Sequence, residues 1–292
     1  MSRFSLLLCF ALPLFGQAPL VIPFRFATPE LPLVFIDIKI NASSSLVAVL
    51  DTGQGVAPII VNQAQARDLG VNFRESDRIA GSFGIGSGPA PAIYRAQALT
   101  LRIGSLTLSE TEAGVSSALE PIGRAIGQLI TANIGYPFLK NYTLILNYSA
   151  RIMTLSRQAL PKGRRFIVGP KKPLAIVEGR INGIGPYRFA VDTGATNSVL
   201  SSTLAQRLLL PRGIPVPVMG ASGSANAYMT KVQVLEVAGR RFSDFSFAAG
   251  DFLDRLTQAV GTNVDGVLGA NAFQNLVLNI DYPNQRLSIT NP

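Results

Sequence analysis

An internal repeat limits the folds that this chain can adopt. When the sequence is shifted by 141 residues, INASSSLVAVLDTG (40–53) lies over INGIGPYRFAVDTG (181–194) without a gap. Both copies begin with Ile-Asn and end with Asp-Thr-Gly, whose aspartates are Asp51 and Asp192. Self-similarity over a whole segment indicates that the same structural unit occurs twice. The chain is therefore predicted to consist of two similar halves, each with one aspartate at an equivalent position.

Alternation of residue types predicts that each half opens with a β-hairpin. Upstream of the shared segment, LVFIDIKI (33–40) alternates as a half-buried strand does, and LAIVEGRI (174–181) is its counterpart. The NASSS and NGIGP sequences that follow are typical of turns. An apolar run then leads to each aspartate, so the second strand of the hairpin ends at the carboxylate. A short helix is expected afterwards in each half, with Asn62 and Ser201 as N-cap residues.

The ends of the two halves match as well, at a shift of 134 residues. NIGYPFLKNYTLILNYSARIMTLS (133–156) lies over VLGANAFQNLVLNIDYPNQRLSIT (267–290). Each copy contains an apolar residue followed by glycine and then a pattern typical of a second hairpin. Between the matching regions each half has a glycine-rich stretch, at 81–94 and at 220–230, with strand patterns around it. Few helical patterns are present, so the fold class is predicted to be all-β.

The residue types that are missing exclude several catalytic classes. The chain has no histidine, and Cys9 is its only cysteine. These absences exclude Ser-His-Asp and Cys-His catalysis and nearly every zinc site. Removal of an N-terminal segment that contains Cys9 leaves no disulfide chemistry either. Hydrolysis by this chain therefore has to depend on carboxylates, without a cofactor.

The paired Asp-Thr-Gly sequences resemble those of aspartic peptidases of the retropepsin and pepsin type. In that family each lobe or subunit presents one Asp-Thr-Gly and a downstream apolar-apolar-Gly, and two lobes face each other around one site. The resemblance covers about residues 31 to 290, and AVDTGATNSVLS (190–201) is its strongest part. Halves of about 120 residues with simple hairpins look retropepsin-like, fused in one chain. The resemblance implies a two-lobed acid-protease fold with an internal pseudo-twofold duplication.

The resemblance also implies that Asp51 and Asp192 form a catalytic dyad. Two carboxylates that lie close together in a low-dielectric cleft cannot both ionise readily, so the pair shares a proton. One aspartate then acts as general base on a water molecule, and the other acts as acid toward the scissile carbonyl. Four neighbours are expected to support the dyad, the threonines by hydrogen bonds across the lobe interface and the glycines by close backbone approach: Thr52, Gly53, Thr193 and Gly194.

The glycine-rich stretches correspond to the family's flaps, hairpins that fold over an extended peptide. A peptide or protein substrate is expected to pair with them by strand addition, and no nucleic acid is expected as a partner. Tyr94 and Tyr228 either line the cleft or pack as ordinary strand aromatics. The predicted flap and substrate-binding residues are Gly86, Gly88, Tyr94, Gly220, Gly223 and Tyr228.

The first half departs from the family pattern directly after its Asp-Thr-Gly. Gln54 and Gly55 stand where the second half has Ala195 and Thr196. A long polar side chain at position 54 tunes the dyad, narrows the cleft or marks a weakened site, and these alternatives stay open. Asn133 stands over an apolar valine of the second half, a difference that we assign to a hairpin end and not to catalysis.

The N-terminal sequence MSRFSLLLCFALPLFGQA predicts a secretory signal peptide over residues 1–18, because Arg3 precedes an apolar stretch that small residues follow. The product is then secreted or located in the periplasm or cell envelope. Six basic residues and no acidic one occur between positions 157 and 173, interrupted by glycines and prolines. This composition predicts a solvated linker, with attraction to an anionic membrane surface as the alternative.

The predicted organisation is a signal peptide (1–18), a first retropepsin-like half (31–157), a basic linker (158–173) and a second retropepsin-like half (174–292). The leading hypothesis is an aspartic endopeptidase that works as a pseudo-symmetric monomer. Two alternatives remain. The halves can pair between chains, so that the enzyme is active only as a dimer, or the protein can bind peptides without useful turnover.

Overall fold

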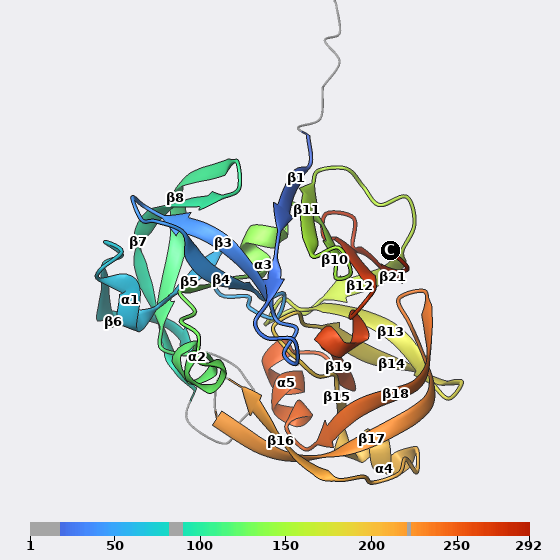
Figure 1. Ribbon diagram of the computed structural model, residues 1–292. Helices are drawn as coiled ribbons and strands as arrows, with labels where there is room; N and C mark the ends of the chain where they lie inside the picture. The colour runs from blue at the N-terminus through green and yellow to red at the C-terminus, as the bar shows by residue number, and fades with distance from the viewer. Residues whose placement is uncertain (1–17, 82–89, 221–222) are drawn as a thin grey trace, which may run out of the picture.

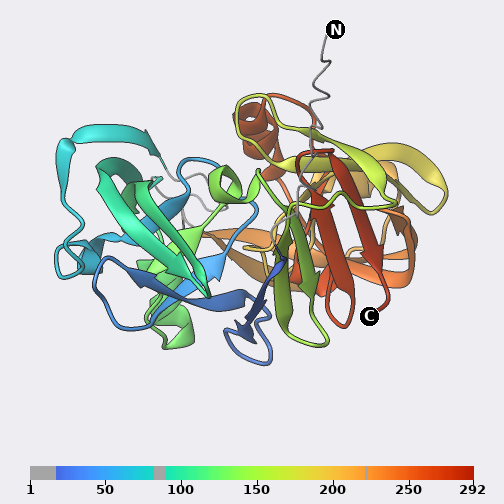
Figure 2. The ribbon, with the colours of Figure 1, turned by 90° about the horizontal axis from the view of Figure 1, so that it is seen from above.

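The computed structural model describes residues 18–81, 90–220 and 223–292. It is mostly β-structure and contains two six-strand barrels, which form two lobes side by side (Figure 1 and Figure 2). The expectation of an all-β, two-lobed acid-protease fold is confirmed.

The strands of the two barrels follow the same order. In the first lobe the order is β3 (Val34–Ile40), β4 (Leu46–Leu50), β9 (Ala132–Ile134), β5 (Ile59–Asn62), β8 (Leu106–Ser116) and β7 (Ala92–Ile103), and β7 closes the barrel by pairing with β3. In the second lobe it is β13 (Ala175–Ile181), β14 (Ile184–Val191), β19 (Gly266–Leu268), β15 (Val199–Ser201), β18 (Arg240–Gly250) and β17 (Gly223–Val237), closed by the pairing of β17 with β13. Each strand of one barrel therefore has a counterpart in the other.

The opening hairpin of each lobe forms where the alternation predicts it. The strands β3 and β13 have the same sequence of buried and exposed residues, three buried positions followed by alternation. Their hairpin turns contain Asn41 and Asn182, whose backbone φ angles are 52° and 51°. Asparagine tolerates this left-handed region better than most residues. Local sequence thus determines where β4 and β14 begin and, in consequence, where the two aspartates lie.

A six-stranded part of the larger sheet joins the lobes, and it is continuous with the second barrel through the pairing of β12 (Arg164–Val168) with β13. Its strand order is β1 (Leu20–Pro23), β11 (Ile152–Ser156), β10 (Thr143–Asn147), β20 (Val277–Asp281), β21 (Arg286–Thr290) and β12. In the central antiparallel pair Ile145 lies opposite Asn279, and these two residues are equivalent in the 134-residue repeat. A pseudo-twofold axis therefore passes through this pair of residues, between the lobes.

The remaining elements are short. Asn62 caps α1 (Gln63–Ala66) by accepting a hydrogen bond from the Ala64 N–H, and Ser201 caps α4 (Ser202–Arg207) through the Leu204 N–H. Both predicted N-caps are confirmed. The other elements are β2 (Arg25–Phe26), β6 (Phe73–Gly81), α2 (Glu120–Ile126), α3 (Tyr136–Leu139), β16 (Pro215–Gly220), α5 (Leu253–Val260) and the 3-10 helix η1 (Ala270–Ala272).

The segment between the lobes is not wholly irregular. Within residues 158–173, β12 pairs with β21 on one side and with β13 on the other. The predicted signal peptide lies outside the described residues except for Ala18. Across the described ranges, no helix is long and apolar enough to cross a membrane.

Candidate active site

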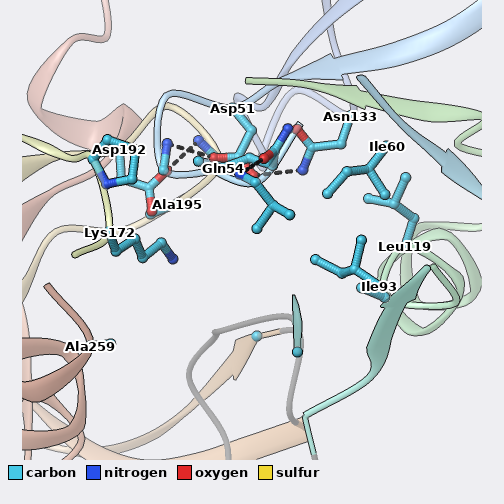
Figure 3. A pocket seen from close by; sticks show the side chains of 18 of the residues that line it. Asp51, Gln54, Ile60, Ile93, Leu119, Asn133, Lys172, Asp192, Ala195 and Ala259 are labelled. Carbon is cyan, nitrogen blue, oxygen red and sulfur yellow. Dashed lines mark hydrogen bonds between the residues drawn. The ribbon is translucent and has the colours of Figure 1, made fainter. Parts of the chain in front are cut away.

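The two aspartates occupy equivalent positions at the lobe interface (Figure 3). Asp51 follows β4, and its backbone N–H donates a 2.9 Å hydrogen bond to the carbonyl oxygen of Ile134. Asp192 follows β14, and its N–H donates a 3.0 Å hydrogen bond to the carbonyl of Leu268. The apolar residue of each apolar-Gly pair therefore anchors the aspartate loop of its own lobe.

Thr52 and Thr193 link the two loops by reciprocal hydrogen bonds. The Thr52 N–H donates to Thr193 Oγ1 at 3.1 Å, and the Thr193 N–H donates to Thr52 Oγ1 at 3.0 Å. Each hydroxyl also donates across the interface, Thr52 to the Val191 carbonyl at 3.0 Å and Thr193 to the Leu50 carbonyl at 2.7 Å. Both threonines are buried, so this network holds the two aspartate loops in a single arrangement.

The glycines of both triplets lie against the carboxylate of the other lobe. A Cβ atom on Gly53 would lie 2.5 Å from Asp192 Oδ2, and one on Gly194 would lie 2.6 Å from Asp51 Oδ1. Each glycine N–H also donates a 2.8 Å hydrogen bond to the aspartate of its own triplet. Any larger residue at either position would push the two carboxyl groups apart.

Burial and the neighbouring carboxyl group of Asp51 change the acidity of Asp192. Burial is the main cause that raises its pKa, to about 7, and the negative charge of Asp51 adds to the effect. The positive charge of Lys172 acts in the opposite direction. A side-chain hydrogen bond with Asp51 further raises the pKa of Asp192, and the N–H of Gly194 lowers it. Burial and the charge of Asp51 therefore favour the protonated form of Asp192.

Asn133 breaks the symmetry of the pair. Its Nδ2 donates a 2.7 Å hydrogen bond to Asp51 Oδ2. The equivalent position of the second lobe is Val267, which has no hydrogen to donate. Our assignment of Asn133 to a hairpin end was therefore wrong. The signal was present in the repeat alignment, as an amide residue over a valine directly before the apolar-Gly pair.

Gln54 stabilises its own loop. Its Nε2 donates to the carbonyl of Ala57 at 2.6 Å, while its Oε1 accepts hydrogen bonds from the N–H groups of Val56 and Ala57. The side chain is buried. These bonds favour a structural role for Gln54 over direct tuning of the carboxylates.

A cavity of about 470 Å³ lies beside the two aspartates, within the size range of small-ligand sites. Apolar side chains of the first lobe form one wall: Val56, Ile60, Ile93, Leu119 and Ile122. Lys171, Lys172 and Ala259 line the cavity on the second-lobe side. In Figure 3 Lys172 extends into the cavity below the dyad, while Ile60, Ile93 and Leu119 lie across from it.

The predicted flap residues have different positions. Gly220, at the end of β16, lines the cavity, whereas Gly223 starts β17 and does not appear in the lining. Gly86 and Gly88 lie outside the described residues. Of the two alternatives for the tyrosines, the contacts favour ordinary strand packing, and neither ring is in the cavity lining. Tyr94 stacks on Phe73 at 5.5 Å, and the guanidinium of Arg212 lies 4.6 Å from the ring centre of Tyr228.

Comparison with protein families gives a match in the second lobe. Residues 177–272 match the family model Asp_protease_2, described as aspartyl protease. The match includes the Asp192 triplet and the Leu268-Gly269 pair, and it supports an aspartic peptidase family. The curated proteins contain no match to the chain.

Proposed function

We propose that this protein is an aspartic endopeptidase made of two tandem retropepsin-like halves, in which Asp51 and Asp192 act as one dyad. The observation that carries the proposal is the contact of each carboxylate with the glycine of the opposite triplet, at the edge of one cavity. Because each carboxylate contacts the glycine beside the other aspartate, the two carboxyl groups lie close together. Two carboxyl groups so close share a proton and provide both an acid and a base. Neither histidine nor a metal is required for that chemistry.

The environments of the two carboxyl groups assign their roles. Each aspartate accepts a hydrogen bond from the glycine N–H of its own triplet, but Asp51 also accepts one from Asn133, where the second lobe has Val267. This additional bond favours the ionised form of Asp51. Asp51 is therefore the general base that removes a proton from the attacking water. Asp192 is the acid that donates a proton to the scissile carbonyl oxygen, because burial and the adjacent charge favour its protonated form. The water oxygen bonds to the carbonyl carbon, giving a tetrahedral diol. The C–N bond then breaks as Asp51 passes its proton to the leaving amine and Asp192 regains a proton from the diol, which becomes the new carboxyl group.

An extended peptide is the substrate class that suits the cavity. The cavity lies between β-strands of both lobes and includes Gly81 and Gly220, which end β6 and β16. Backbone groups at such strand ends can pair with an extended peptide. One chain supplies both aspartates, which supports a monomer over a dimer with intermolecular sites. We also propose a secreted or envelope location, on the basis of the signal-like sequence over residues 1–18.

Digestion of a random peptide library tests the proposed function. We expect cleavage by the wild-type mature chain and none by Asp51→Asn or Asp192→Asn. The double variant is expected to be no worse than either single variant, because residues that act as one unit lose their effect together. Asp244→Asn is the matched control, since Asp244 is exposed and outside the cavity lining.

Two results would contradict the proposal in different ways. Substantial activity in either single variant would mean that the aspartates do not act as one dyad. Tight binding of peptides by the wild-type chain without any cleavage would instead favour the alternative of a peptide-binding protein.

A further inference from the structure

The loop between the lobes carries Lys172 into the cavity. Three backbone hydrogen bonds define this loop. Gly169 N–H donates to the Leu174 carbonyl at 2.9 Å, Leu174 N–H to the Lys172 carbonyl at 2.9 Å, and Lys171 N–H to the Val260 carbonyl at 3.0 Å. The last bond attaches the loop to the end of α5. The position of Lys172 is thus fixed by the fold.

The first lobe is shaped to receive this loop. A Cβ atom on Gly55 would lie 2.5 Å from Cδ of Pro173, so only glycine permits the contact. The equivalent residue of the second lobe is Thr196. The departure of the first half from the repeat at Gly55 therefore has a physical reason, because it admits the loop that carries Lys172 against the Asp51 loop.

The charges of the two aspartates act on the ammonium group of Lys172. Burial lowers the pKa of its ammonium group, while the charges of Asp192 and Asp51 raise it. Lys171 and Lys172 are the basic residues among those that line the cavity, and the dyad supplies the acidic ones. When the dyad holds one proton, the lining therefore carries two positive charges against one negative charge. An added carboxylate is attracted to this cavity despite the aspartates.

The two sides of the cavity differ in chemistry. The first-lobe wall of Ile60, Ile93 and Leu119 suits a large apolar side chain, and the Lys172 side suits an anion. Figure 3 shows these groups across the cavity from one another, with the dyad between them along one edge. A peptide that passes the dyad in an extended conformation meets both sides.

We infer that Lys172 is a specificity-determining residue that selects peptides with an acidic side chain on one side of the scissile bond and a large apolar side chain on the other. This inference rests on the proposed function, because only a peptidase has a scissile bond in its substrate. A hydrogen bond between charged groups in such a site favours the acidic peptide by about tenfold to a hundredfold.

The test measures binding, so that it does not depend on turnover. The peptides contain a reduced, non-cleavable bond. In each pair, one peptide has Glu and the other has Gln on one side of that bond, with Leu on the other side. A second pair has the two sides exchanged. At pH 6 we expect the wild-type chain to bind the Glu peptide about ten to a hundred times more tightly than the Gln peptide in one of the two pairs. The Lys172→Gln variant should bind both peptides equally, with the Kd of the Gln peptide close to the wild-type value. That unchanged Kd also shows that the variant is folded.

An exposed lysine provides the matched control. Lys162→Gln changes a residue of the same segment that is not in the lining, and this variant should keep the preference for Glu.

Three results would overturn the inference. They are no preference in the wild-type chain, a preference that survives Lys172→Gln, and an equal gain in affinity for both peptides in that variant. The last result would mean that Lys172 obstructs the cavity instead of reading the substrate. Failure of the proposed function is separate, because it appears as peptide binding without cleavage.

Discussion

The hydrogen bond from Asn133 to Asp51 leads to a quantitative prediction for the variant Asn133→Val. This substitution places at position 133 the residue type that the second lobe has at Val267. It removes the 2.7 Å hydrogen bond from Nδ2 to Asp51 Oδ2 and introduces a β-branched residue into β9, where strands favour it. The barrel is therefore expected to stay intact while the dyad loses a donor.

The hydrogen bond gives the direction of the effect, and typical hydrogen-bond energies give its size. The donor stabilises the ionised form of the pair, so its loss moves the acid limb of the pH profile of kcat/KM toward higher pH. A hydrogen bond to a charged group contributes about 1.5 to 3 kcal/mol, and one pH unit corresponds to about 1.4 kcal/mol. Asp51 is half-buried, so we expect the lower end of that range, a shift of about one pH unit.

The assay is a pH–rate profile of kcat/KM on one peptide for four proteins. They are the wild-type chain, Asn133→Val, the isosteric Asn133→Asp, and Asn72→Val as a control at an exposed asparagine outside the cavity lining. Asn133→Asp should shift the acid limb further in the same direction, because it adds a like charge. A limb that stays in place in both Asn133 variants while activity falls at every pH would refute the reasoning and leave Asn133 a packing role.

Three other predictions follow from the same site. Thr52→Val and Thr193→Val should each lower the free energy of unfolding by about 1 to 3 kcal/mol, and urea denaturation of both and of the double variant should give a non-zero coupling energy; additive effects would contradict the reciprocal network. Gly53→Ala should abolish cleavage, because its Cβ meets Asp192; a circular dichroism spectrum like that of the wild-type chain would separate this from unfolding, and normal activity would refute it. The folded-state pKa of Asp192 is raised to about 7, so its ionisation opposes folding, and the free energy of unfolding should fall as pH rises from about 4 to 7. Urea denaturation at a series of pH values should show a flatter slope for Asp192→Asn. An unchanged slope would mean that another group causes the pH dependence.

Short-range chemistry explains why much of the architecture was predictable from the sequence. Alternation along 33–40 and 174–181 depends on neighbouring residues alone, and the structure has β3 and β13 there. The caps Asn62 and Ser201 act within two or three residues of their own positions. Because of the repeat, each local prediction for one half also applied to the other half. The repeat also identified both aspartates at the ends of equivalent strands. Pseudo-twofold pairing follows once two such halves share a sheet.

The tertiary structure decided the features that make the two halves unequal. Asn133 lies 82 residues from Asp51 in the sequence. Pro173 contacts Gly55 although the strands of the first barrel that follow Gly55 separate the two residues in the sequence. No local pattern reports such contacts, because they depend on which loops the closed barrels bring together. A basic segment with glycines and prolines reads as a solvated linker by composition, yet its Lys172 lines the cavity. Composition describes how a segment interacts with water, whereas the path of the chain between two packed lobes determines what its side chains contact.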